Sequence, residues 1–364
     1  SWGPLGPFDD SMPRLLKENG IHAHLTSDHY HYWETGGATY HTQYSTWSFS
    51  RGQEGDPWIG RVADPEVPAS DRWLGRRGDL VRQDFINRSV IRNEEDFPQS
   101  KTFADGLAFI EANRGEDGWF VQIETFDPHE PFFSPEAYAK LYGVDRQARH
   151  FDWPEYKRVT ETPDEAEHCR KEYAALVSMC DANLGKVLDA MDRWNLWEDT
   201  MLIVTTDHGF LLGEHDWWGK NKMPLYNEIA RIPFFCWDPR LQQRGTRYDG
   251  LTQLIDVGPT LLDYFGVPVP ESMLGRPLRE GIESGRSPRE AVLFGFHGGQ
   301  VNCTDGRYVY MRGPAAPDNG PLYEYTLMPC RMAQMFAPER LRDMELAEPF
   351  SFTKGVRTMK IPAG

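Results

Sequence analysis

Asp207 and His208 are adjacent residues whose side chains are both of the types that hold a divalent metal ion. They follow the apolar run of residues 201–204, which is typical of a central parallel strand, and polar residues begin where this run stops. In open α/β sheets, ligands bind at the carboxyl ends of the strands. A carboxylate beside an imidazole suits Mn²⁺ or Zn²⁺ better than Ca²⁺ but excludes none of them. The alternatives are a helix N-cap for Asp207 and a core histidine for His208.

Lys220 follows Trp217, Trp218 and Gly219, so its stem can lie against an apolar wall while its ammonium group faces an anion. A metal ion and a fixed cation together neutralise the charge that develops when a sulfate or phosphate ester is hydrolysed. Trp218 is a further candidate for substrate binding, by stacking on a sugar or aryl ring, although tryptophan is also ordinary core material. The alternative for Lys220 is an ordinary surface lysine.

Three histidines lie near other expected strand ends. His129 stands between Pro128 and Pro131, which hold the backbone extended and fix the direction of the imidazole. Such an imidazole can protonate a leaving alkoxide, or it can simply be structural. His29 and His31 alternate on a segment that we expect to be extended, so both can face one pocket as catalytic residues, and we favour His31.

The elements that must position these side chains alternate between helix and strand. This alternation predicts an α/β fold with a doubly wound, mostly parallel sheet between helices. Farther on, two expected strands flank the turn at residues 305–306 and predict a small C-terminal antiparallel subdomain. We therefore expect a catalytic domain over residues 1–273 and a subdomain over 274–364. The expected helices are residues 12–19, 101–113, 169–194 and 257–265, and the expected strands are 21–26, 119–125, 201–204, 291–296 and 307–311.

The composition excludes several classes of protein. A net charge of -16 over 364 residues argues against binding to nucleic acid or to an acidic membrane. No apolar run approaches the length of a membrane-spanning helix. Five cysteines at irregular spacing give neither a disulfide framework nor a zinc pattern, which favours a reducing compartment and a cytoplasmic location. The expected partner is a small anionic ester, with no nucleic acid and no membrane.

Several motifs resemble the type I sulfatases of the alkaline phosphatase superfamily, and in particular a bacterial branch of sulfatase-like hydrolases. The resemblance covers nearly the whole chain, and both spacing and context match. The motifs are Asp207-His208-Gly209, Gly213-Glu214-His215, Trp218-Gly219-Lys220, Arg231-Ile232-Pro233, the loop at residues 126–132 and the segment at residues 251–266.

The resemblance implies one divalent metal ion at Asp207 and His208, with Ca²⁺ favoured and Mn²⁺ or Zn²⁺ as alternatives. It also implies that Lys220 and His129 bind the sulfate group. His31 is the expected counterpart of a family histidine, while the lysine that accompanies that histidine in many sulfatases is absent here.

The family nucleophile is a formylglycine, made from the cysteine of a Cys-x-Pro-x-Arg segment, and this chain has no such segment. Cys236 comes nearest, but one residue too many separates it from Pro239, so we interpret it as a structural thiol. We expect the nucleophile upstream of residue 1. Three hypotheses follow: a sulfuric ester hydrolase, a phosphonate monoester or phosphodiester hydrolase on the same scaffold, and an inactive remnant or subunit that needs an N-terminal segment or a second copy.

Overall fold

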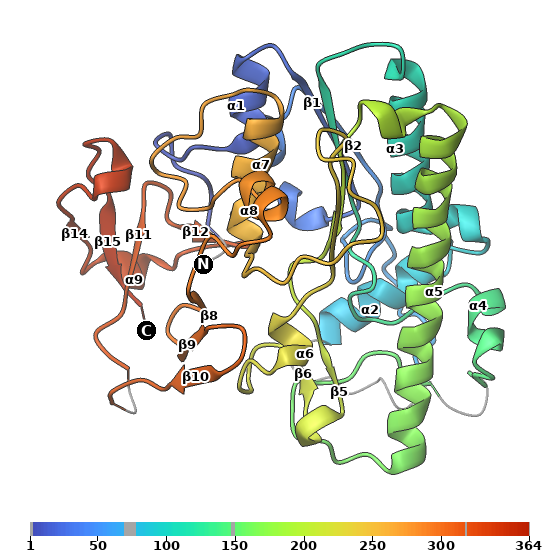
Figure 1. Cartoon of the computed structure of the whole chain (residues 1–364). Helices are drawn as coiled ribbons and strands as arrows, with labels where there is room; N and C mark the ends of the chain where they lie inside the picture. Colours follow the sequence, from blue (N-terminus) through green and yellow to red (C-terminus); the bar gives the residue numbers. More distant parts are fainter. Residues whose placement is uncertain (1–2, 69–77, 147–149, 317–318, 364) are drawn as a thin grey trace.

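The computed structural model has a parallel sheet between layers of helices and a group of antiparallel strands in its C-terminal part (Figure 1). The sheet has the order β2-β1-β3, and its register aligns Ser27 with Phe49 on one side and with Glu124 on the other. The three strands are β1 (His22–Ser27), β2 (Thr46–Phe49) and β3 (Trp119–Glu124). The structure describes residues 3–68, 78–146, 150–316 and 319–363.

Helices α1 (Met12–Glu18) and α7 (Val257–Tyr264) cover one face of this sheet. Helix α1 begins with a proline in its first turn, where the missing N–H costs nothing. Leu16 and Leu262 are fully buried against each other, and Phe120 of β3 packs on the same cluster. Burial of this kind stabilises a domain by about 25 cal/mol for each Å² of apolar surface.

Helices α3 (Pro98–Asn113) and α5 (Pro163–Arg193) run side by side over the other face (Figure 1). Ile110 and Met191 form a core with Val121 and Ile123 of β3. Gly106 lets α3 approach the sheet, because a Cβ atom there would lie 2.5 Å from the side chain of Ile123. Helix α5 begins with a reciprocal capping box, which fixes its first turn.

A second pair of strands carries the segment predicted to bind metal. Strand β4 (Leu202–Thr205) pairs antiparallel with β7 (Phe234–Trp237), and Thr205 is aligned with Phe234. The short hairpin of β5 (Leu211–Leu212) and β6 (Trp218–Gly219) then returns the chain toward the end of β4. Gly219 has a positive φ of 111°, which favours glycine at the residue before Lys220.

The C-terminal part is built of antiparallel strands. Three of them form a sheet in the order β10-β9-β8, from β8 (Val292–Gly295), β9 (Val301–Thr304) and β10 (Val309–Arg312). A second sheet has the order β11-β15-β14. The other C-terminal strands are β11 (Tyr323–Thr326), β12 (Cys330–Arg331), β13 (Gln334–Met335), β14 (Glu345–Leu346) and β15 (Met359–Pro362).

The β12-β13 hairpin reaches back to the main sheet region. The backbone N–H of Gly36 donates a hydrogen bond of 2.6 Å to the carbonyl of Met332. A Cβ atom at Gly36 would lie 2.5 Å from the backbone nitrogen of Met332, so a side chain there would force the hairpin away. The shorter helices are α2 (Gly78–Arg88), α4 (Glu136–Leu141), α6 (Asn227–Ala230), α8 (Arg279–Ser284) and α9 (Pro338–Leu341).

The predicted α/β fold class is confirmed, with parallel strands between helices and antiparallel strands near the C-terminus. One strand was missed: β9 lies directly before the turn at residues 305–306, so this turn joins β9 to β10 rather than β8 to β10. The boundary at residue 273 and the cytoplasmic location stay predictions. Within the described residues, none of the helices combines the length and apolar composition that crossing a lipid bilayer requires.

Asp28 and Asp127 carry two buried carboxyl groups in the segments that directly follow β1 and β3. Asp28 accepts hydrogen bonds from the backbone N–H of Phe126 at 2.6 Å and from the Gln53 amide at 3.1 Å. Asp127 accepts from the Gln99 amide at 3.0 Å. Burial raises the pKa of Asp127 to about 7, and burial together with the nearby Asp127 raises the pKa of Asp28. The network fixes the loop that follows β3.

The raised pKa of Asp127 predicts a pH dependence of stability. Between about pH 4 and pH 7 the folded chain holds a proton here that the unfolded chain has lost, so this group lowers the free energy of unfolding as pH rises. Through this group, the free energy of unfolding of the parent chain should fall by about 2–3 kcal/mol between pH 5 and pH 7. We expect Asp127→Asn to remove this decrease. Urea unfolding at the two pH values measures this. Asp105→Asn, at an exposed position of α3, is the matched control. An equal change in the free energy of unfolding between the two pH values in Asp127→Asn and in the parent chain would contradict the assignment.

Candidate active site

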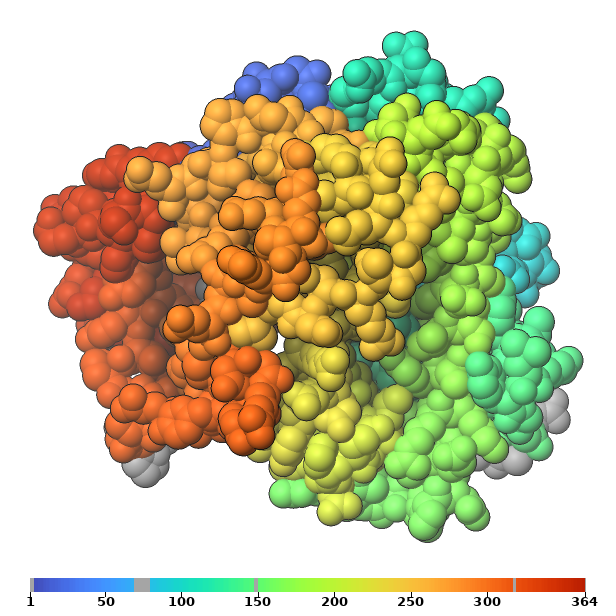
Figure 2. Space-filling model, viewed as in Figure 1, coloured from blue at the N-terminus to red at the C-terminus, as the bar shows by residue number. Residues whose placement is uncertain are grey.

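A large cavity opens where β3 and β4 end. Its volume is about 3350 Å³, and the loops after both strands line it. In the space-filling view, a hollow lies between the green helix α5 and the yellow segments that follow β4 (Figure 2). His129, Asp207, His208 and Lys220 all line this cavity, so the structure brings the principal predicted site residues together.

Lys220 and His129 are in direct contact. The Nζ atom of Lys220 lies 2.5 Å from Nε2 of His129, and Nδ1 of His129 lies 2.5 Å from the backbone carbonyl oxygen of Glu130. This geometry assigns the tautomer: Nδ1 carries the proton and donates to the carbonyl, and Nε2 accepts from the ammonium group. Burial lowers the pKa of His129 to about 4; the carboxylate of Glu130 opposes this shift and Lys220 adds to it. The imidazole is therefore neutral at neutral pH.

Glu130 supplies the negative charge beside this pair. Its buried carboxylate lies 3.7 Å from Nζ of Lys220 and 3.4 Å from Nδ1 of His129, and the hydroxyl of Tyr156 donates to it. Burial alone would raise the pKa of Glu130, but His129, Lys220 and Tyr156 outweigh burial and hold it below its usual range. Glu130 was not predicted as a site residue. Its position next to His129, between two prolines, was the signal that could have indicated it.

Asp207 and His208 occupy the turn directly after β4. Oδ2 of Asp207 lies 3.2 Å from Nε2 of His208, and the two side chains are 75% and 39% exposed. Nδ1 of His208 lies 2.9 Å from the carbonyl of Gly209, an arrangement that directs the Nε2 lone pair outward. These two donors fit a divalent cation. Within the described residues, no group of three or more His, Cys, Asp or Glu side chains is arranged to hold a metal ion.

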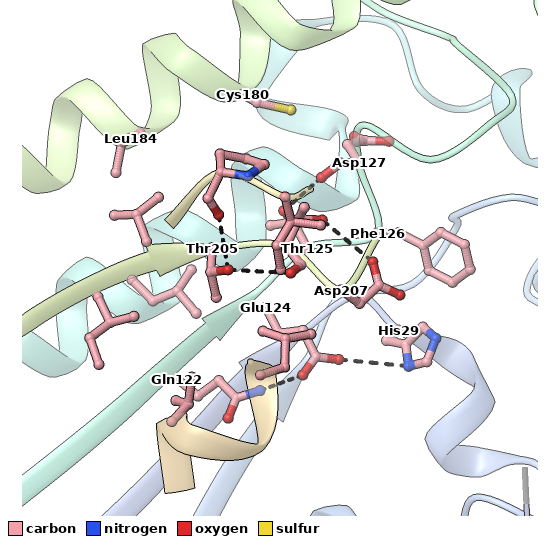
Figure 3. Close-up of a pocket in the computed structure, with 18 of the residues that line it drawn as sticks. His29, Gln122, Glu124, Thr125, Phe126, Asp127, Cys180, Leu184, Thr205 and Asp207 are labelled. Atoms are coloured by element: carbon pink, nitrogen blue, oxygen red, sulfur yellow. Dashed lines mark hydrogen bonds and ion pairs between the residues drawn. The ribbon is translucent and has the colours of Figure 1, made fainter. Parts of the chain in front are cut away.

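His29 and His31 both line the cavity, but not by the predicted geometry. The segment is not extended, because residues Tyr30–Trp33 form a 3₁₀ turn that places the two imidazoles edge to face at 5.1 Å. His31 contacts Glu34, with 2.6 Å between Nδ1 and Oε2. His29 points toward Glu124, at 3.6 Å, and burial lowers its pKa to about 3 (Figure 3). A catalytic role for either residue stays a prediction.

Two predictions concern residues outside the cavity. Trp218 has no exposed surface and packs in a core with Phe132 and Leu176, and its indole N–H donates to Glu161 at 2.9 Å. It therefore presents no surface to a substrate, so the prediction that it stacks on a sugar or aryl ring is wrong. Cys236 lies in β7, where burial raises its pKa to about 11, as suits a structural thiol.

Three other residues of the cavity went unpredicted. Glu124 ends β3 and accepts hydrogen bonds from the hydroxyl of Tyr32 at 3.0 Å and from the Gln122 amide at 2.5 Å. Burial raises the pKa of Glu124. Glu54 is partly buried, where burial and the charge of Glu130 raise its pKa to about 7. The third is Tyr156, the partner of Glu130. No local pattern in the sequence distinguishes these residues from surface residues.

Comparison with known proteins gives a family match for most of the chain. A family model described as Sulfatase matches residues 2–267. The chain is 24% identical over 279 residues to an arylsulfatase of Clostridium perfringens, a match that covers 68% of this chain and 56% of the relative. It is 32% identical over 131 residues to an N-acetylglucosamine-6-O-sulfatase of Bacteroides thetaiotaomicron, covering 35% and 23%. The matches thus span about half or less of these relatives.

The fold is also similar to solved structures. A phosphonate monoester hydrolase from Silicibacter pomeroyi superposes with a TM-score of 0.62 at 20% identity, covering 85% of this chain and 72% of that one. At this identity the likeness concerns the fold alone. The family model covers most of the chain and includes the loop after β3, the turn after β4 and Lys220. On this basis the chain belongs to the sulfatase family.

Proposed function

We propose that the polypeptide carrying these residues hydrolyses a sulfate ester of a carbohydrate or an aryl alcohol. The observation that carries the proposal is the contact between Lys220 and His129, which line the same cavity as the turn that carries Asp207. It holds an ammonium group beside a neutral imidazole, in the same cavity as Asp207 and His208, the proposed metal ligands. The arylsulfatase and the N-acetylglucosamine-6-O-sulfatase among the relatives support this class of substrate.

Lys220, His129 and Glu130 would each have a part in binding the ester. The ammonium group of Lys220 donates one hydrogen bond to His129, so its other N–H bonds remain for the oxygens of a sulfate group. Its charge offsets the negative charge that develops on the leaving oxygen. His129 holds the ammonium group of Lys220 in place through Nε2. The carboxylate of Glu130 balances the positive charge of that ammonium group.

Asp207 and His208 would hold a divalent ion, with Ca²⁺ favoured and Mn²⁺ or Zn²⁺ as alternatives. When bound, such an ion supplies Lewis-acid stabilisation to the sulfate oxygens. The formylglycine nucleophile of the family would come from outside residues 1–364. His29 and His31, which line the same cavity, are the candidates for contacts with that nucleophile.

A phosphonate monoester or phosphodiester hydrolase is the second candidate, because the phosphonate monoester hydrolase from Silicibacter pomeroyi shares the fold. An ammonium group, an imidazole and a metal ion would serve either ester, since both carry negative oxygens at the reacting centre. An inactive chain, or one that acts only with a partner, is the third candidate. It would keep the site geometry but show no turnover.

Relative rates on two chromogenic esters test the function. We expect the polypeptide that contains this chain to hydrolyse p-nitrophenyl sulfate with a higher kcat/KM than p-nitrophenyl phenylphosphonate. A preference for the phosphonate of tenfold or more would favour the second candidate. An absence of both activities, in a preparation whose formylglycine is verified by peptide mass, would favour the third.

Removal of the metal ion is a separate prediction. Dialysis against a chelator should abolish sulfate ester hydrolysis, because Asp207 and His208 alone leave an anionic substrate without its main positive charge. Separate addition of Ca²⁺, Mn²⁺ and Zn²⁺ should restore activity to different extents, with the greatest recovery for the resident ion. Activity that persists after complete removal of divalent ions, verified by elemental analysis, would contradict the assignment.

Lys220→Ala should reduce kcat/KM for the sulfate ester about 10²–10³-fold, as expected when one group that stabilises transition-state charge is lost. The matched control is Lys222→Ala, two residues farther on and exposed, which should stay within twofold of the parent. Steady-state kinetics on both variants measures this. An equal loss in both would mean that general surface charge, rather than the contact with His129, attracts the ester.

A further inference from the structure

Two tryptophans differ from the others in their exposure. Trp33 and Trp47 are each 42% exposed, whereas the other tryptophans that the structure describes are buried or half-buried. An indole ring contributes most to stability when it is buried, so these two large rings add little to the core. Single apolar residues on a surface are ordinary, but a contiguous patch of them marks a binding surface.

The two tryptophans belong to one cluster of rings. Trp33 stacks on Phe49 of β2, with 3.7 Å between ring centroids and 13° between the ring planes, and on His41 at 4.7 Å. The imidazole of His41 also meets the ring of Trp47 edge to face at 5.0 Å. Trp47 and Phe49 alternate along β2, so they lie on one face of that strand. We call Trp33, His41, Trp47 and Phe49 the indole platform.

Regular structure holds the indole platform in place. Trp33 ends the 3₁₀ turn of residues Tyr30–Trp33, His41 begins the 3₁₀ turn of residues His41–Gln43, and the other two rings belong to β2. His41 is 9% exposed, and burial lowers its pKa, so its imidazole is neutral at neutral pH. Rings that are fixed before binding lose little side-chain entropy when a partner binds.

The segment that carries most of the indole platform has no charged residues. Residues 35–50 contain no Asp, Glu, Lys or Arg, although these four types make up 26% of the chain. Ser, Thr, Tyr and Gln are frequent there instead. The charged residues on either side are paired: Glu34 contacts His31 at 2.6 Å, and Arg51 forms an ion pair with Asp56 at 2.6 Å. These surroundings suit a neutral partner whose groups form hydrogen bonds.

We propose that the indole platform binds a neutral glycan chain, with its tryptophans stacked on the C–H faces of the sugar rings. A pyranose ring with equatorial hydroxyl groups has apolar faces and a polar rim, which matches indole rings set among hydroxyl-bearing side chains. Two indoles in one patch can hold at least two sugar rings, so a chain binds more tightly than a monosaccharide. The proposal does not rest on the ester chemistry proposed above.

The indole platform adjoins the cavity of the candidate active site. His31, Tyr32 and Glu34 line the cavity, and Trp33 lies among them in sequence, with its ring 6.3 Å from that of Tyr32. Trp33 itself is not part of the lining, so the platform and the cavity share a boundary rather than a surface. A glycan chain held on the platform would therefore have its next sugar rings beside the cavity wall.

A protein partner fits these features less well. Protein interfaces also use tryptophan as an anchor, but arginine and charged rims commonly accompany it and orient the partner. Here Arg51 lies over the ring of Phe49 at 5.6 Å, and Asp56 already offsets its charge. A second copy of this chain would bring another net charge of -16, which the indole platform has no unpaired cation to balance.

Calorimetric titration of the polypeptide that contains this chain tests the proposal without any activity measurement. The probe is an uncharged hexamer of β-1,4-linked N-acetylglucosamine, whose ring substituents are all equatorial, and the comparison is the N-acetylglucosamine monomer. We expect the hexamer to bind at least about tenfold more tightly than the monomer, because it covers both indoles. Its Kd should stay within about twofold between low and high salt, since salt screens only charges.

Four variants locate the binding. Trp47→Ala should weaken binding of the hexamer about tenfold, because one stacking surface is lost, and Trp47→Phe should recover part of that loss. Trp33→Ala should also weaken binding, with thermal unfolding to verify that the variant is folded. The matched control is Tyr308→Ala, which removes a ring that is 65% exposed in the turn between β9 and β10 and should bind the hexamer like the parent.

Several results would overturn the proposal. These are no binding of the hexamer by the parent, equal affinities for hexamer and monomer, an affinity that survives both alanine substitutions, or an equal loss in Tyr308→Ala. Trp47 is joined to the platform through His41, so Trp47→Ala decides the test if Trp33→Ala does not fold. Self-association of the parent that Trp47→Ala abolishes, without any binding of the hexamer, would identify a second copy as the partner.

Discussion

The contact between Lys220 and His129 is the interaction on which the rest of the site depends. A largely buried ammonium group is costly unless it is paired, and here a neutral imidazole and the carboxylate of Glu130 share that task. One partner belongs to the loop after β3 and the other follows the β5-β6 hairpin. The contact therefore holds two separate parts of the chain at a fixed distance, and the turn that carries Asp207 lies between them in sequence.

The sequence predicted the parts of this arrangement that depend on local pattern. Helical periodicity located α5, and the apolar run before Asp207 located β4. Asp207 and His129 line one cavity at the ends of β4 and β3, but β4 pairs antiparallel with β7 instead of joining the parallel sheet as the apolar run predicted. Lys220 was found through the glycine and tryptophans that precede it, although its contact with His129 was not foreseen.

Predictions failed where distant contacts decide the local structure. The segment of His29 and His31 turns into a 3₁₀ helix, with Tyr30 stacked near Phe126, rather than continuing the extended strand. Trp218 lies next to residues of the site in sequence but fills the core behind them. Glu54 and Glu124 are partly buried by elements far along the chain, and no single-sequence pattern distinguishes a partly buried carboxylate from a surface one.

The β12-β13 hairpin has a consequence for the evolution of this fold. Residues 331–334 form part of the cavity wall, yet they reach it from the C-terminal strands and rest on the backbone of Gly36. A lineage could therefore change the shape of the wall by altering a four-residue tip, while the residues on the parallel sheet stay under selection for their chemistry. Divergence in the choice of alcohol would then be recorded in the C-terminal strands, with the proposed ester-binding residues left unchanged.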